Sequence, residues 1–191
     1  MNSNEKLLVC LYSDANFLAL NILENLLSNG CLVNVVTDDI KNWKDRTENL
    51  AAKNKFAFCK ITDVNKDQIY NYIIFCSGFL SKPRIHEEYV RFSSLIRVGT
   101  QKLFILLPFE TYEDNVDLIK ISDNSAVIYL GDLLGPRLDL SSDLLMSSSL
   151  NEIIRERKLS VSIGEIFCPV FVPDVIRLIV KWMFAFGPYG K

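Results

Sequence analysis

Short runs of apolar residues alternate along the chain with segments whose apolar residues have helical spacing. The first run, residues 6–12 (KLLVCLY), predicts a buried strand. Residues 15–27 have the apolar periodicity of a helix, and Asn29-Gly30 is a typical helix stop. Residues 31–37 (CLVNVVT) predict a second strand, which is followed by Asp38-Asp39. This order of strand, helix, strand and acid is the layout of a nucleotide-binding half-domain, in which the acid meets a ribose hydroxyl.

The same alternation continues to the end of the chain. We expect further strands at residues 56–61, 72–76, 102–107 and 126–130. Between them we expect a polar helix or loop at residues 42–54, a short helical turn at 65–70 and an amphipathic helix at 83–98. Continuous apolar strands that alternate with helices indicate a parallel sheet covered on both faces. The predicted fold class is therefore α/β, with a mostly parallel sheet of about six or seven strands.

Composition narrows the possible partners and compartment. The 191 residues include 21 basic and 23 acidic side chains without a block of like charge, which argues against nucleic-acid binding. The five cysteines are scattered, so we expect reduced thiols, no disulfide and no metal site. The first residues lack the apolar region of a signal peptide, and no stretch approaches the ~20 apolar residues that cross a bilayer. We expect a cytoplasmic protein without membrane contact.

Two motifs in the last third resemble a known family. Residues 131–137 (GDLLGPR) and 169–180 (PVFVPDVIRLIV) resemble segments of the extended short-chain dehydrogenase/reductases, the NAD-dependent sugar-nucleotide epimerases and dehydratases. In the second motif a strand leads into a helix that Asp174 is expected to cap. The resemblance implies one Rossmann-like, three-layer domain of the NAD(P)-binding type over residues 1–191. It also implies that residues 131–191 are a reduced form of the family's substrate-side segment.

The resemblance also assigns cofactor contacts. It places Ser13, Asn16 and Ala19 on the three fingerprint glycines, Asp38 on the ribose-binding acid and Asp63 on the acid near adenine. The expected contacts of NAD or NADP, at the carboxyl ends of the first, second and fourth strands, are Ser13, Asp14, Asn16, Asp38, Asp63 and Ser77. Side chains fill the room that glycine leaves for a diphosphate, so we expect weakened binding. Alternatively, Asp38 and Asp39 cap the helix that follows them.

The family's catalytic pair is absent from the sequence. Its chemistry needs a Tyr-x-x-x-Lys, in which the lysine lowers the tyrosine pKa. No tyrosine here has lysine at that spacing; Tyr112 is followed by Val116. Thr111 and Tyr112 are the candidates nearest the expected catalytic position. We expect a catalytically degenerate protein. The alternative is an active NAD(P)-dependent epimerase, dehydratase or reductase with an atypical site, whose base is Tyr112 or a carboxylate within residues 110–114.

Two further roles remain open from the sequence. A degenerate relative of the epimerases would bind a nucleotide or nucleotide-sugar without turnover, or would present a surface to a protein partner. The apolar ending, residues 175–186 (VIRLIVKWMFAF), favours the second role, because Trp182, Phe184 and Phe186 make a large apolar helix face. That face would bind a partner or a second copy of the chain. Alternatively, it simply covers the sheet.

Overall fold

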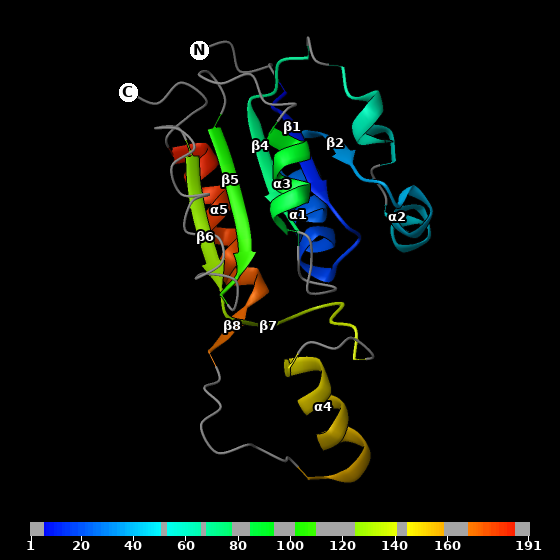
Figure 1. Cartoon of the computed structure of the whole chain (residues 1–191), viewed down its shortest axis with the longest axis vertical. Helices are drawn as coiled ribbons and strands as arrows, with labels where there is room; N and C mark the ends of the chain where they lie inside the picture. Colours follow the sequence, from blue (N-terminus) through cyan, green and yellow to red (C-terminus); the bar gives the residue numbers. More distant parts are fainter. Residues whose placement is uncertain are drawn as a thin grey trace.

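Six parallel strands form the main sheet of the protein, as the computed structural model shows (Figure 1). The structure describes residues 6–50, 53–65, 68–77, 85–93, 102–109, 125–140, 145–158 and 168–185. The sheet has the order β3-β2-β1-β4-β5-β6, so the strand order reverses between β1 and β4. Its strands are β1 (Leu8–Ser13), β2 (Leu32–Val36), β3 (Phe56–Cys59), β4 (Tyr72–Cys76), β5 (Lys102–Pro108) and β6 (Ser125–Leu130). The predicted α/β class and strand number are confirmed.

Helices cover both faces of this sheet. Successive residues of a strand point to opposite faces, and in β1 Leu11 and Tyr12 belong to two separate apolar clusters. The cluster around Leu11 includes residues of α1 (Phe17–Ser28), α2 (Ile40–Thr47) and α5 (Val172–Ala185). The cluster around Tyr12 includes residues of α3 (Ile85–Ser93). The molecule is therefore a three-layer sandwich, with α3 in front of the sheet in Figure 1 and α1 and α5 behind it.

The two family-like motifs pair with each other in a second, small sheet. There β7 (Asp132–Leu134) runs parallel to β8 (Pro169–Phe171). The backbones approach closely, because a Cβ at Gly131 would lie 2.3 Å from the carbonyl oxygen of Cys168. Between these strands in sequence, α4 (Leu145–Glu156) stands apart from the main sheet (Figure 1).

Several predicted boundaries need correction. The helical turn expected at residues 65–70 lies partly outside the described residues: the Gln68 N–H donates to the Asn65 carbonyl at 3.0 Å, as in a single turn, but residues 68–70 are not helical. A 3₁₀ turn lies earlier, at η2 (Ile61–Asp63). Residue 71 is tied to β1 instead, since the Asn71 N–H donates to the Leu8 carbonyl and the Leu8 N–H donates to the Asn71 side chain. The other 3₁₀ turn, η1 (Lys53–Lys55), directly precedes β3.

The helix predictions also shift at their ends. Helix α2 begins two residues earlier than expected, and the amphipathic helix is described over Ile85–Ser93; the rest of the predicted range 83–98 lies outside the described residues. Asp174 is not a cap, because α5 begins at Val172; Asp174 lies in its first turn and pairs with Arg177 at 3.2 Å. No described helix has the length and apolar character needed to cross a membrane.

Candidate functional site

The turn between β1 and α1 is built around the side chain of Asn16. This residue has an extended backbone and caps α1, with its Oδ1 accepting a hydrogen bond from the Ala19 N–H at 2.8 Å. Asparagine is among the best residues for this role, because its oxygen satisfies an N–H that has no partner within the helix. The side chain is fully buried. The residue expected to stand in for a glycine therefore fixes the start of the helix.

The amide nitrogen of Asn16 closes the same turn. It donates to Ser13 Oγ at 3.0 Å, to the Asp14 carboxylate and, at 3.4 Å, to the carbonyl oxygen of Cys76 at the end of β4. Ser13 in turn donates to the Asp14 carbonyl at 2.5 Å. These bonds link the carboxyl ends of β1 and β4, where the strand order reverses. Ligands of open α/β sheets bind at such a point.

Helix α2 holds the turn from its other side. The indole N–H of Trp43 donates to the Ser13 carbonyl at 3.2 Å, and the Arg46 guanidinium donates to the Ala15 carbonyl. Trp43 is completely buried. Backbone carbonyls of the turn thus accept bonds from side chains of α2, and the turn is fixed by contacts that lie beyond its own sequence.

Two carboxylates lie beside the turn. Ser77, buried at the end of β4, donates to the carboxylate of Glu88 on α3. Burial raises the pKa of Asp14 from its ordinary value of 3.8 to about 6, and the negative charge of Glu88 adds to this rise. Hydrogen bonds from Asn16 and Ser13 oppose it. Because this value lies below 7, Asp14 carries a negative charge at neutral pH.

The two acids after β2 have separate roles. Asp39 caps α2, because its carboxylate accepts from the Asn42 N–H at 3.1 Å. Asp38 instead forms an ion pair with Arg91 of α3, 3.1 Å away. The capping alternative is thus confirmed for Asp39, whereas the expected ribose acid contacts an arginine of its own chain.

The remaining predicted residues are less connected. Asp63 ends η2, after β3, and its exposed carboxylate accepts from the Thr62 hydroxyl at 2.9 Å. Thr111 and Tyr112 lie outside the described residues, as do the carboxylates expected within residues 110–114. The structure therefore brings Ser13, Asp14, Asn16 and Ser77 together, joined through Cys76 and Glu88, and links Asp38 to the same helix as Glu88.

Sequence reasoning missed the contributions of α2 and α3. Glu88 and Arg91 reach the expected cofactor residues from α3, and Trp43 and Arg46 reach the turn from α2. No spacing rule identifies them, since each contacts a residue at least eleven positions away. Only the way the helices pack on the sheet brings these side chains to the turn.

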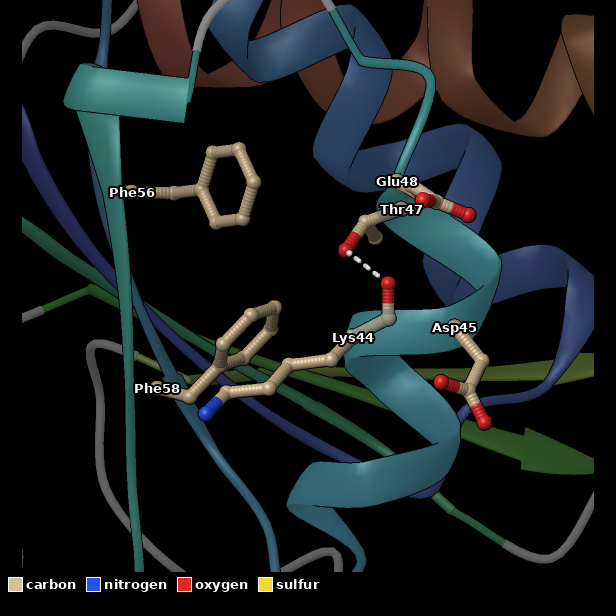
Figure 2. A pocket seen from close by; sticks show the side chains of 6 residues that line it. All are labelled: Lys44, Asp45, Thr47, Glu48, Phe56 and Phe58. Carbon is tan, nitrogen blue, oxygen red and sulfur yellow. Dashed lines mark hydrogen bonds between the residues drawn. The ribbon is translucent and has the colours of Figure 1, made fainter.

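Two hollows in the described surface lie elsewhere. A groove of about 490 Å³ separates α2 from the edge strand β3 (Figure 2). Phe56 and Phe58 face the helix across it, Lys44 extends beside Phe58, and Asp45 and Glu48 point away from the rings. A second hollow of about 450 Å³ lies between α1 and α5. None of the six expected cofactor contacts lines either hollow. Within the described ranges no three metal-binding side chains gather into a possible ion site.

Comparison with known proteins gives the fold. No protein-family model matches the sequence, and no curated protein matches it significantly. Among solved structures, the chain resembles TunA, an NAD-dependent NDP-hexosamine 5,6-dehydratase involved in tunicamycin biosynthesis, with a TM-score of 0.66 and 13% identity over 95% of this chain and 73% of that chain.

Two further solved structures have the same fold. UDP-glucose 4-epimerase of Thermotoga maritima, in complex with UDP-glucose, gives a TM-score of 0.67 and 18% identity over 92% of this chain and 73% of that one. Vestitone reductase of alfalfa (Medicago sativa) gives a TM-score of 0.63 and 14% identity over 96% of this chain and 74% of that chain. The expected resemblance is confirmed at the level of the fold: the protein has the Rossmann-like α/β fold of the extended short-chain dehydrogenase/reductases.

Proposed function

We propose that this protein is a catalytically degenerate, epimerase/dehydratase-like Rossmann protein that binds NAD or NADP weakly and acts by binding a partner. The observation that carries the proposal is the closed turn after β1, where Asn16 caps α1 and bonds to Ser13, Asp14 and Cys76. A diphosphate at a glycine-rich turn needs backbone N–H groups and empty space beside them. Here the buried amide of Asn16 fills that space.

Electrostatics support the same conclusion. The carboxylates of Asp14 and Glu88 are close enough for Glu88 to raise the pKa of Asp14. A nucleotide diphosphate would bring further negative charge to these two groups, and the partial burial of Asp14 strengthens the repulsion. The turn therefore repels the chemical group that a dinucleotide site must attract.

The missing catalytic pair is a separate argument for degeneracy. No tyrosine of the chain has a lysine four residues later. The segment that links β5 to β6 spans only residues 109–124, which leaves little room for the long helix that carries this pair in the family. Residues 131–191 fit the proposal as a reduced substrate-side segment, because their two motifs pair as β7 and β8.

One observation favours a second candidate, the binding of NADP or another phosphorylated nucleotide without turnover. Arg91 lies 3.1 Å from Asp38, so a cation stands beside the expected ribose acid. An arginine in this place suits a 2′-phosphate better than a free ribose hydroxyl. TunA is NAD-dependent, and the similar epimerase was solved with UDP-glucose. NAD and UDP-glucose are therefore suitable ligands, beside NADP, with which to test binding.

Calorimetric titration of the full chain with NAD, NADP and UDP-glucose tests the two candidates. Under the main proposal, all three ligands bind with dissociation constants of about 1 mM or weaker. The second candidate requires NADP to bind at least about tenfold more tightly than NAD, with this preference lost in Arg91→Ala. Asp45→Ala is the control, because Asp45 lies on α2 and its carboxylate points away from the rings of Phe56 and Phe58 in Figure 2.

Two outcomes would contradict degeneracy. The first is micromolar binding of NAD by the wild-type chain that Asp38→Ala abolishes and Asp45→Ala leaves unchanged, since the ribose acid would then work as it does in an intact cofactor site. The second is turnover of a nucleotide-sugar that disappears in Tyr112→Phe.

A further inference from the structure

Helix α5 has a partly exposed stripe, with large apolar side chains in it, that adjoins the face that covers the sheet. Its inner face consists of buried side chains at helical spacing, namely Val172, Val175, Ile176, Ile179 and Met183. The outer stripe comprises Phe171, which directly precedes the helix, together with Asp174, Leu178, Lys181 and Trp182, spaced three or four residues apart along one side. Phe171, Leu178 and Trp182 are 50%, 44% and 37% exposed. Large apolar side chains in a row on an exposed helix face mark an interaction surface.

The stripe lies toward an open edge of the sheet. The Trp182 ring contacts the ring of Phe104 on β5, with 6.2 Å between centroids. Beyond β5 lies β6, the last strand of the described sheet on that side, and α5 runs behind these two strands (Figure 1). Another protein surface could therefore approach α5 from beyond β6 without displacing a described element.

The charged residues of the stripe indicate which partner it would bind. Asp174 and Lys181 lie four residues before and three residues after Leu178. Suppose that a second α5 packs antiparallel to the first, with the Leu178 side chains of the two copies in contact. A residue that lies a given number of positions before Leu178 in one copy then faces the residue that lies the same number of positions after Leu178 in the other. Asp174 of each protomer then lies within one residue, about 1.5 Å along the axis, of the partner's Lys181. Two opposite-charge pairs form by symmetry, and Trp182 packs beside Asp174 and Phe171 of the partner.

We propose that the outer stripe of α5 is a self-association surface that binds a second copy of this chain in an antiparallel, two-fold arrangement. The surface is complementary to itself, as a two-fold interface must be. Lys181 lines the hollow between α1 and α5 and makes no ion pair with any described residue, whereas Asp174 already pairs with Arg177 of its own helix and would contact Lys181 of the copy as a second cation. This inference goes beyond the proposed function, because it uses no residue of the turn after β1.

Sedimentation equilibrium of the full chain over a concentration series tests the association. The wild-type chain is expected to approach twice its monomer mass, whereas Leu178→Asp stays monomeric with an unchanged melting temperature. Lys181→Asp is expected to raise the dimer dissociation constant about tenfold, because it places two acids opposite each other. Adding Asp174→Lys to that variant restores opposite charges and is expected to recover most of the affinity.

Disulfide trapping tests the register. With the exposed Cys168 replaced by serine, Leu178→Cys is expected to cross-link to itself under mild oxidation, since the two copies of this position meet on the axis. Ser28→Cys, exposed on α1, is the matched control and is expected to stay uncrosslinked. A monomeric mass at every concentration, or a dimer that Leu178→Asp leaves intact, would overturn the inference. The nucleotide titrations are independent of this result, so the two proposals fail separately.

Discussion

The side chain of Asn16 holds the turn after β1 through hydrogen bonds from both its oxygen and its nitrogen. Its oxygen caps α1 and its nitrogen ties the turn to Asp14 and to the end of β4. A glycine at this position would leave the Ala19 N–H without its side-chain acceptor. Under the proposed function, the amide that stabilises the turn also fills the space that a diphosphate would need, so stability and cofactor binding would compete at Asn16.

The raised pKa of Asp14 gives a test of this turn by pH. The unfolded chain loses the proton near pH 3.8, whereas the folded chain keeps it until about pH 6. Between these values the folded state binds more protons, so the free energy of unfolding falls as the pH rises and stays low above pH 6. Asp14→Asn removes this penalty and keeps an oxygen to accept from Asn16. It is expected to raise the free energy of unfolding at pH 7 by about 1–3 kcal/mol.

Urea unfolding at pH 4 and pH 7 measures this difference. The gain of Asp14→Asn over the wild type is expected at pH 7 and is expected to shrink toward zero at pH 4. Asp63→Asn, which changes an exposed carboxylate in the same way, controls for the loss of one negative charge. An equal gain at both pH values would show that burial of the Asp14 carboxylate does not govern the stability of the turn.

At the scale of elements, α3 connects the carboxyl ends of β2 and β4 through side-chain contacts. Phe92 anchors it against the stacked rings of Tyr12 and Phe75, at centroid distances of 5.0 and 5.1 Å. From that anchor, Glu88 reaches Ser77 after β4 and Arg91 reaches Asp38 after β2. Aromatic packing thus positions the charges that occupy two of the expected cofactor contacts.

The β7–β8 pair depends on a close approach that only glycine permits. A Cβ at Gly131 would lie 2.3 Å from the Cys168 carbonyl oxygen and 2.9 Å from the Cys168 Cβ. Because the oxygen belongs to the backbone, the strands must separate to admit a methyl group. Gly131→Ala is therefore expected to lower the free energy of unfolding by about 1–3 kcal/mol, measured by urea denaturation.

Gly30 provides the contrast for this prediction. It has a φ of 82°, and no atom lies within 4 Å of the position that a methyl group would take, so only its backbone conformation restricts substitution. Gly30→Asn is expected to be nearly neutral, since asparagine tolerates the left-handed region. If Gly131→Ala were equally neutral, the close approach of β7 and β8 would not contribute to stability.

At the scale of the whole molecule, stability is distributed unevenly. The central strands β1 and β4 lie between two apolar clusters and are almost entirely buried. Helix α4 stands apart from the sheet (Figure 1), and its residues 153–156 are exposed, including Ile153 and Ile154. The two regions therefore differ in how much burial holds them in place.

Hydrogen exchange is expected to follow this distribution. Amides of β1 and β4 should exchange only through global unfolding, while those in the last turn of α4 should exchange through local opening at much lower free energy. Exchange followed by mass spectrometry, with Leu178→Asp as a monomeric control, measures both regions. Protection of the α4 amides equal to that of β1 would contradict the prediction.

Apolar periodicity alone determined the order of strands and helices, because burial on two faces imposes a regular pattern on any α/β chain. The sequence also shows directly that the first turn, residues 13–19, contains no glycine and that no tyrosine has a lysine four residues later. Only the tertiary structure decided that Trp43 of α2 bonds to the Ser13 carbonyl, that Asp38 pairs with Arg91 and that Glu88 lies beside Asp14. These contacts join residues that local spacing does not relate, and they follow from the way α2 and α3 pack against the carboxyl ends of the strands.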